Sequence, residues 1–333
     1  MQKLVEVIRG SLVENIHIGS VMVVDTMGNT IAQIGDDFQT YLRSSAKPLQ
    51  LLPLIESHCS EKFGFTDKEL AIMAGSHYGT AEHATTIAGI LAKLELPLEA
   101  LQCGIHVPFS RAYAEELQLQ GKVPTVLNNN CSGKHSAMLA LCKHFDWEIA
   151  SYLSPSHPVQ KLMLKTISEM ADLDKDSISV GIDGCGVPVF GFSLSAMALA
   201  FARLGSSNKL SSQRKLACEK VCSVMRDYPL MIAGEGALDT ALLSLPQANI
   251  ISKIGAEAVF CFALPDKGLG VALKIADGNT KMLGPVVVET LNQLGILNAE
   301  ELNKLNKYHN IAIKNFAKTL VGEIRPAFSL NFL

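Results

Sequence analysis

The sequence predicts an α+β fold in which strands from both ends of the chain form one antiparallel sheet and a helical region is inserted between them. Strand-like segments open the chain and return only near its end, whereas the middle carries mainly helical patterning. Because strands and helices are segregated along the chain, an alternating βαβ arrangement is disfavoured. We expect a single domain over residues 1–333, with a sheet region at 1–46 and 247–333 and a helical region at 47–246.

Composition and charge narrow the class of protein. The chain has 333 residues, is 48% hydrophobic and 18% charged, and has a formal net charge of −3 without a lysine-rich or arginine-rich run. This argues against nucleic acid and against an anionic membrane surface as partners. The N-terminus lacks the apolar stretch of a signal peptide, and no membrane-spanning segment stands out. We therefore expect a cytoplasmic protein whose eight cysteines are mostly reduced.

The strands of the sheet region are predicted by two turn signals. Val21–Asp25 and Thr30–Ile34 flank Met27-Gly28-Asn29, which is typical of a hairpin. Residues 250–264 and 268–276 flank Pro265-Asp266-Lys267-Gly268, a second turn. Residues 320–327 resemble a last short strand.

Apolar periodicity predicts the helices, and Pro and Gly break the runs. Helical patterning covers 47–58, 67–75, 80–94, 110–119, 133–146, 158–171, 188–204, 211–226 and 237–244, followed by 281–295 and 299–307.

The first stretch that suggests chemistry is Arg43-Ser44-Ser45-Ala46-Lys47, at the start of an apolar helix. On a helix, residues three apart share a face, so Ser44 and Lys47 are expected to point the same way. A serine hydroxyl needs an adjacent base to become a nucleophile, and a lysine with a lowered pKa can serve. The alternative is a serine that only caps the helix.

Three further stretches are rich in polar groups and glycine. Ser76 and His77 follow Gly75, where a turn is the simple alternative. Asn128 to Ser136 is the densest polar cluster of the chain, and a helix cap with a turn does not account for all of its groups. Gly181 to Pro188 holds Asp183 and Cys185 among three glycines, which allow close approach of the backbone to a ligand. If Cys131 and Cys185 converge, two thiolates with Lys134 or His135 suit zinc, although no Cys-x-x-Cys spacing is present.

The last stretch is Lys253-Ile254-Gly255, where a lysine enters a late strand. Its position after the helical region matters more than the tripeptide itself. Gly234-Glu235-Gly236, shortly before it, is a glycine-flanked acid whose simple alternative is the start of a helix.

With these stretches together, the chain resembles the asparaginase II family of the rhizobial type, which is related in fold to serine β-lactamases and glutaminases. The matches follow the family's order and cover nearly the whole chain: Arg9-Gly10, Arg43 to Pro48, Gly75-Ser76-His77, Asn129 to His135, Asp183 to Pro188, Gly234-Glu235-Gly236 and Lys253-Ile254-Gly255. Two positions depart from the pattern. Ala237 stands where an arginine is expected, and Ile254 replaces the threonine of the broader Lys-Thr-Gly motif.

The resemblance implies roles for particular residues. It pairs Ser44 with Lys47 and Ser76 with Lys253 as catalytic couples. It also implies a zinc site and a substrate site. The zinc ligands would be Cys131, Lys134 and Cys185. The substrate-binding residues would be Arg43, Asn130, Asp183 and His135. His135 is also the alternative zinc ligand, because it follows Lys134 directly.

The activity implied by the resemblance is hydrolysis of L-asparagine to L-aspartate and ammonia by a homodimer. Ser44 is favoured as nucleophile, and Ser76 is the alternative that attacks or relays protons. A glutaminase or a β-lactam-recognising serine hydrolase is the alternative enzyme, because Ser-x-x-Lys and Lys-x-Gly serve all three chemistries. An amino-acid-binding protein without turnover is the alternative outside enzymes.

Overall fold

A computed structural model describes residues 1–208 and 210–333, and this part of the chain divides into two compact units. Unit 1 comprises residues 1–45, 192–206 and 245–333, and unit 2 comprises residues 46–191 and 207–244. The α+β class is confirmed, since the strands of both chain ends form one sheet in unit 1. Residues 192–206, which the sequence places in the helical region, are part of unit 1.

Unit 1 is an antiparallel sheet with three long helices. Its strands run in the order β10-β11-β1-β2-β9-β8-β7, and β3 lies beside β2 and β12 beside β3. The strands are β1 (Gln2–Arg9), β2 (Leu12–Asp25), β3 (Thr30–Ile34), β7 (Ile251–Gly255), β8 (Val259–Leu264), β9 (Leu269–Ile275), β10 (Ile311–Lys314), β11 (Leu320–Pro326) and β12 (Asn331–Phe332). The short strand β4 (Gln39–Tyr41) is not part of this sheet. The helices are α8 (Leu194–Gly205), α12 (Leu283–Gln293) and α13 (Ala299–His309).

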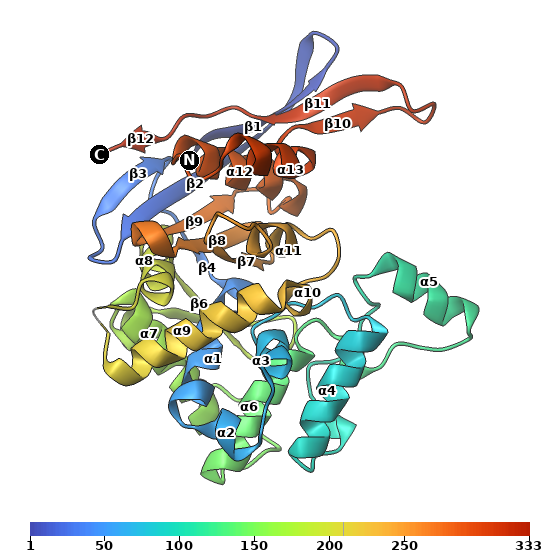
Figure 1. The fold of residues 1–333 in the computed structure, drawn as a ribbon, viewed down its shortest axis with the longest axis vertical. Coiled ribbons are helices and arrows are strands. Elements are labelled where there is room, and N and C mark those ends of the chain that lie inside the picture. The colour runs from blue at the N-terminus through green and yellow to red at the C-terminus, as the bar shows by residue number, and fades with distance from the viewer. Residues whose placement is uncertain (209) are drawn as a thin grey trace. The chain divides into compact units, whose positions relative to one another are not determined.

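Long-range pairing organises the sheet around β2. The end of β2 pairs with β3, with Val21 opposite Ile34, which confirms the first predicted hairpin. The same part of β2 pairs with β9 on its other side, with Val23 opposite Val271. The helix α8 packs on β9, β8 and β2, while α12 contacts β11, β1 and β8 (Figure 1). Burial of both faces explains why the central strands are almost continuously apolar.

Unit 2 is helical. Its helices are α1 (Lys47–Glu56), α2 (Cys59–Lys62), α3 (Asp67–Met73), α4 (Ala81–Lys93), α5 (Arg111–Leu119), α6 (Ser132–Phe145), α7 (Pro158–Ala171), α9 (Ser212–Asp227), α10 (Pro229–Ile232) and α11 (Leu238–Leu243). Residues Ser179–Ile182 form strand β5, which pairs with the first residues of β6 (Pro188–Ser193). The helix α1 is buried over its first eight residues and packs against α9, α7 and α6 (Figure 1).

Two predicted elements were wrong in detail. Residues 188–193 form strand β6 and not the start of a helix, because Val189, Phe190 and Phe192 have branched or aromatic side chains that suit a strand. The stretch 250–264 is two strands, β7 and β8, and not one. Glu257 and Ala258 adopt positive φ angles of 60° and 54° and turn the chain there without the usual glycine pair.

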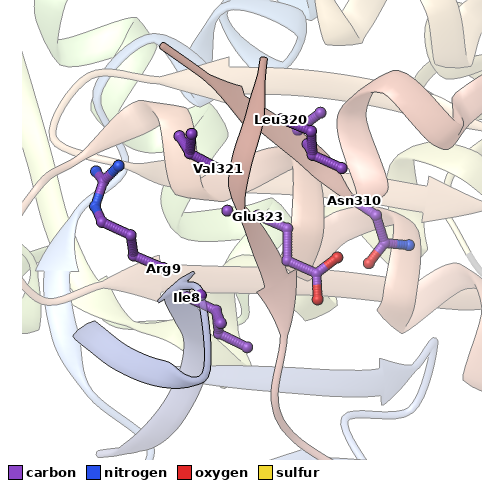
Figure 2. Close-up of a pocket in the computed structure, with 9 residues that line it drawn as sticks. Ile8, Arg9, Asn310, Leu320, Val321 and Glu323 are labelled. Atoms are coloured by element: carbon purple, nitrogen blue, oxygen red, sulfur yellow. The ribbon is translucent and has the colours of Figure 1, made fainter.

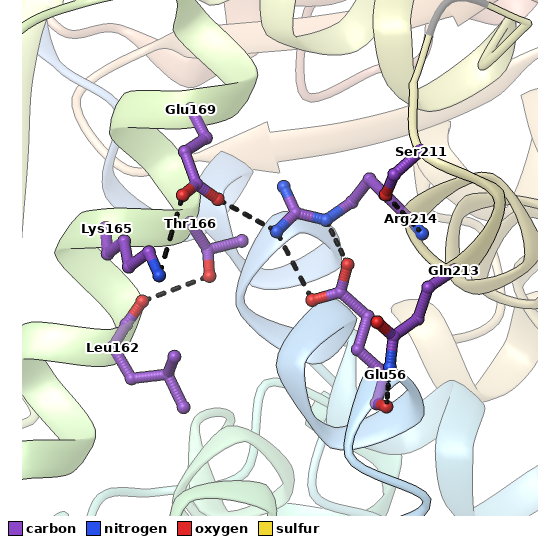
Figure 3. A network of polar contacts seen from close by, with 8 residues as sticks. All are labelled: Glu56, Leu162, Lys165, Thr166, Glu169, Ser211, Gln213 and Arg214. Atoms are coloured by element: carbon purple, nitrogen blue, oxygen red, sulfur yellow. Dashed lines mark hydrogen bonds and ion pairs between the residues drawn. The ribbon is translucent and has the colours of Figure 1, made fainter.

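An ion-pair network joins three helices of unit 2 (Figure 3). The Arg214 guanidinium on α9 bonds both carboxylate oxygens of Glu56 at the end of α1 and lies 3.0 Å from Glu169 Oε2 on α7. The Gln213 amide also donates to the Glu56 carbonyl oxygen at 2.6 Å. The side chain of Arg214 is 13% exposed, so the contacts are largely shielded from water.

We predict that Arg214→Met lowers the free energy of unfolding by about 2 kcal/mol, because it leaves the Glu56 carboxylate shielded and unpaired. Urea unfolding measures the change. Arg111→Met is the matched control. The Arg111 side chain is 92% exposed beside Glu115, so its loss should cost under about 0.5 kcal/mol. Equal losses of unfolding free energy in the two variants would contradict the prediction.

Within residues 1–208 and 210–333, no helix has both the length and the apolar character needed to cross a membrane.

Candidate active site

The side chain of Lys47 is the centre of a buried polar cluster in unit 2. Lys47 is the first residue of α1 and only 1% exposed. Its Nζ donates to Ser76 Oγ at 2.8 Å and to the carbonyl oxygen of Asn130 at 3.0 Å, and it lies near the Cys131 thiol. The contact of Lys47 with Ser76 is one that the predicted pairing of serines and lysines did not include.

The pKa of Lys47 is lowered. Burial is the largest cause, because it disfavours the charged ammonium, and the positive charge of Lys134 acts in the same direction. Negative charge on Cys131 and Cys185 partly opposes the shift. A lowered pKa is what a lysine needs to accept a proton from a serine hydroxyl.

Ser76 is held by the backbone of its own segment. The Ser76 N–H donates to the carbonyl oxygen of Ile232 at 2.7 Å, and the Tyr78 N–H donates to that of Ala233 at 2.9 Å. Gly75 makes this pairing possible, because a Cβ there would lie 2.4 Å from the Met231 carbonyl oxygen. The glycine before Ser76 is thus explained by close backbone approach and not by a simple turn.

The three consecutive asparagines have different tasks. The Asn128 side chain donates to the carbonyl oxygen of Gly79 at 2.8 Å and so holds the loop after Ser76. The Asn129 side chain accepts from the Cys131 N–H at 2.8 Å and donates to the carbonyl oxygens of Cys103 and Gly104.

Asn130 presents its backbone to the cluster. The N–H bonded by Asn129 and the Asn130 carbonyl oxygen bonded by Lys47 belong to one peptide group, so that peptide is fixed from both sides. The Asn130 N–H donates to His106 Nε2 at 3.0 Å. Asn130 is therefore held in place by its neighbours, as a binding or positioning residue must be.

Cys131, Lys134 and Cys185 lie together, as the resemblance implied. Lys134 Nζ donates to Cys185 Sγ at 3.0 Å, and the Cys131 thiol lies near that of Cys185. All three side chains are buried.

Cys131, Lys134 and Cys185 shift one another's pKa values. The hydrogen bond from Cys185 holds the pKa of the Cys131 thiol well below its usual value, against the cost of burial and with help from Lys47 and Lys134. Burial opposes the charge on Lys134, but the two thiols and Asp183 outweigh it and raise the pKa of Lys134. The cluster therefore stabilises a thiolate between two amines.

Asp183 lies in the turn between β5 and β6, two residues before Cys185. Its carboxylate accepts from the Gly184 N–H at 2.8 Å, and its backbone bonds Val187 and Gly186. The charge on Asp183 acts on both Lys134 and Cys131, which places it in the neighbourhood of the cluster.

Arg43, Ser44 and Lys253 belong to unit 1. Arg43 and Ser44 lie in a 3-10 helix, Arg43–Ala46, that leads directly into α1. Arg43 has a φ of 50°, a left-handed conformation that costs free energy for a residue with a side chain and that is often found at functional sites. Ser45 Oγ donates to the carbonyl oxygen of Lys253 at 2.7 Å, so the Ser44 segment and strand β7 are neighbours. Lys253 is fully buried.

Sequence reasoning missed His106 and Tyr152. His106 Nδ1 lies 2.7 Å from the Val107 carbonyl oxygen, which leaves Nε2 to accept from Asn130. Tyr152 Oη lies 2.6 Å from His135 Nδ1. Neither residue stands in a recognisable motif, and their tasks arise from loops that meet only in the folded chain.

Unit 1 also has a hollow with a volume of about 760 Å³. Several of the residues that line it are labelled in Figure 2. It is lined by Ile8, Arg9, Gly10, Asn310, Ala312, Leu320, Val321, Gly322 and Glu323. None of the site residues expected from the sequence lines this hollow, so its size does not make it the candidate active site.

Two buried histidines beside Ser76 make stability depend on pH. His77 Nδ1 accepts from the Gly79 N–H, its Nε2 lies 2.9 Å from Ser132 Oγ, and its ring stacks on His83. Burial lowers the pKa of both histidines, and their mutual repulsion further lowers that of His77. The native state therefore holds them neutral.

We predict that the free energy of unfolding falls by about 1–3 kcal/mol between pH 7.5 and pH 5.5. Below the unfolded histidine pKa of about 6.5 the unfolded chain binds protons that the native chain excludes, so stability falls as pH falls. Urea unfolding at the two pH values measures the effect. His77→Gln should reduce the pH dependence, and an unchanged slope in that variant would contradict the assignment.

Comparison with known proteins identifies the family. The sequence model of the L-asparaginase II family matches residues 5–326. The chain belongs to the L-asparaginase II family. It is a hydrolase that acts on amide bonds, and its substrate is a small molecule. A comparison with curated proteins finds no match.

Solved structures offer only distant likenesses. A beta-lactamase from Mycobacterium bovis has a TM-score of 0.40 and 12% identity, covering 84% of this chain and 95% of that one. The unliganded simvastatin synthase from Aspergillus terreus has a TM-score of 0.39 and 12% identity, covering 87% of this chain and 91% of that one. These TM-scores lie below 0.5, and the assignment of function does not depend on them.

Proposed function

We propose that the protein hydrolyses the side-chain amide of L-asparagine to L-aspartate and ammonia, with Lys47 as general base. The observation that carries the proposal is the 2.8 Å hydrogen bond between the buried Lys47 amine and Ser76 Oγ. Membership of the L-asparaginase II family supports the substrate.

The proposed reaction has two steps. The neutral Lys47 amine takes the Ser76 proton as the serine oxygen attacks the amide carbon, and ammonia leaves with a proton returned from Lys47. Water then attacks the resulting ester and releases L-aspartate and the free serine. Ser44 is the alternative nucleophile, since it precedes Lys47 by three residues, and Ser44 and Lys253 keep the roles that the family resemblance implies.

Two assays test the proposal. Ammonia release is measured with L-asparagine and L-glutamine, and a chromogenic β-lactam is tested beside them. We expect turnover of L-asparagine in preference to the other two. Peptide mass spectrometry after rapid acid quench locates the acyl group, which we expect on Ser76. An acyl group on Ser44 would overturn the assignment of the nucleophile, and binding of L-asparagine without ammonia release would favour an amino-acid-binding protein.

We also propose a zinc site formed by Cys131, Lys134 and Cys185. Thiolate and nitrogen donors suit zinc, and these three groups lie close together in a buried cluster, with Lys134 Nζ 3.0 Å from Cys185 Sγ. The described residues hold no group of three or more His, Cys, Asp or Glu suited to a metal, so the lysine amine is needed as third donor. When bound, zinc would supply a Lewis acid that polarises or orients the substrate.

We predict that Cys185→Ser lowers the zinc content from about one ion per chain to less than about 0.1, because a serine hydroxyl replaces a thiolate ligand. Elemental analysis of the purified proteins measures the content. The control is Cys218→Ser on α9. It also replaces a buried cysteine, and it should leave the zinc content unchanged. Because the donors must lose protons, zinc should be released as pH falls. Wild-type protein without zinc would remove the site and leave the serine chemistry standing.

A homodimer is proposed from the family resemblance. The β1–β2 hairpin exposes the apolar side chains of Leu12, Val13 and Ile16, and Leu320 lies exposed on β11. Surfaces of this kind often mark contacts between proteins. Sedimentation equilibrium should give twice the 35.9 kDa mass of the chain, and the mass of a single chain would contradict the proposal.

A further inference from the structure

One site residue has a buried ring nitrogen without a hydrogen-bond partner among the described residues. His135, in the first turn of α6, is 0% exposed. Its Nδ1 lies 2.6 Å from Tyr152 Oη, whereas its Nε2 is buried and has no hydrogen-bond partner in the described part of the chain. A buried donor left without a partner costs about 1–3 kcal/mol, so such groups call for an explanation.

The environment of Tyr152 determines where the proton of His135 lies. The Gln102 backbone N–H donates to Tyr152 Oη at 3.0 Å. With its oxygen accepting there, the single hydroxyl proton of Tyr152 is free to point to His135 Nδ1. In a neutral ring one nitrogen accepts and the other carries the proton. In the arrangement that gives the Tyr152 hydroxyl proton an acceptor, His135 Nδ1 accepts it and the ring proton lies on Nε2.

The position of His135 links it to the candidate active site. It directly follows Lys134 in the first turn of α6, and its ring is fully buried.

Burial and packing restrict the movement of Tyr152 beside His135. It is fully buried, and its backbone carbonyl accepts from the Gln160 side-chain amide at 2.8 Å. Its ring meets the His135 ring edge-on, with centroids 5.6 Å apart and an interplanar angle of 85°. With its backbone bonded by Gln160 and its hydroxyl bonded by Gln102 and His135, Tyr152 has little freedom to move its hydroxyl away from His135.

We propose that Tyr152 is a positioning residue that fixes His135 as an Nε2–H donor, and that this donor binds an oxygen atom of the substrate. The acceptor is the α-carboxylate or the side-chain carbonyl of the amino acid, and this identity rests on the proposed function.

The tautomer is tested without any turnover. Two-dimensional ¹H–¹⁵N NMR of histidine side chains distinguishes a ring protonated on Nε2 from one protonated on Nδ1. We expect the Nε2–H form for His135 in the wild type and a mixture of the two forms in Tyr152→Phe. Tyr228→Phe removes a hydroxyl at an exposed position and should leave His135 unchanged. An Nδ1–H ring in the wild type overturns the proposal.

The donor role is tested with the reaction product as probe. L-aspartate should shift the His135 Nε2–H resonance, and Tyr152→Phe should weaken the L-aspartate Kd and raise the KM for L-asparagine about tenfold, with a smaller change in kcat. An unmoved resonance at saturating L-aspartate, or a Kd within twofold of wild type, overturns this role.

A second variant separates positioning from loss of structure. In His135→Gln the side-chain amide donates from nearly the place of Nε2 and has no tautomers. If Tyr152 acts through His135, adding Tyr152→Phe to His135→Gln should change the L-aspartate Kd less than twofold. A further tenfold loss would show a merely structural role. Wild-type protein with the expected tautomer and L-aspartate response but no ammonia release would refute the proposed hydrolysis and leave this inference standing.

Discussion

Lys47→Met should lower kcat for L-asparagine hydrolysis by about 10³- to 10⁴-fold while the protein remains folded. Methionine fills the buried space at the start of α1 but carries no amine to accept the Ser76 proton. General base catalysis contributes about 10²- to 10⁴-fold, and loss of the serine's activation places the effect toward the upper end. Initial rates of ammonia release at saturating substrate measure it.

The control for this variant is Lys62→Met. Lys62 lies at the end of α2, where its amine reaches the His144 carbonyl oxygen at an exposed position, and its replacement should leave kcat within twofold. Circular dichroism checks that both variants are folded. A folded Lys47→Met enzyme that keeps more than a tenth of the wild-type kcat would exclude Lys47 as the base.

Gly133→Ala should reduce both stability and activity. A Cβ on Gly133 would lie 2.2 Å from the carbonyl oxygen of Ile72 and 2.8 Å from its carbonyl carbon, so α6 and α3 must separate to admit one methyl group. Overpacking of this kind costs about 1–3 kcal/mol or more. The first turn of α6 also carries Lys134 and His135, so the displacement should lower kcat/KM at least tenfold. Urea unfolding and steady-state kinetics measure the two effects.

Gly184→Ala provides the comparison. It lies in the turn before Cys185, and a Cβ there meets no atom within 4 Å. We expect unfolding free energy within about 0.5 kcal/mol of wild type. If the two alanine variants were equally stable, close packing of α6 on α3 would not be the reason for glycine at position 133.

The sequence could predict the class of fold because its signals are local. The hairpin of β2 and β3 follows from the turn signal Met27-Gly28-Asn29 between two strand-like segments, and the helix boundaries of α7 agree with the periodicity. Prediction failed where tertiary contacts determine the structure. The strand β6 continues directly into α8, so no polar loop marks the change, and β10 and β12 are too short to give a periodic signal.

Tertiary contacts also limited what the sequence could predict about the candidate active site. Cys131 and Cys185 are far apart in sequence, and only the family resemblance placed them with Lys134. Spacing suggests pairs such as Ser44 with Lys47, since both lie on one short segment. It cannot show that Lys47 bonds Ser76, because that contact depends on the pairing of the Ser76 segment with Ile232 and Ala233.

The most direct measurement of the central claim is the rate of ammonia release from L-asparagine by wild type and by Ser76→Ala. The account predicts steady turnover by the wild type and a loss of at least about 10³-fold in the variant, because the hydroxyl bonded to Lys47 is gone. A Ser76→Ala enzyme that turns over L-asparagine within tenfold of the wild-type rate would contradict it.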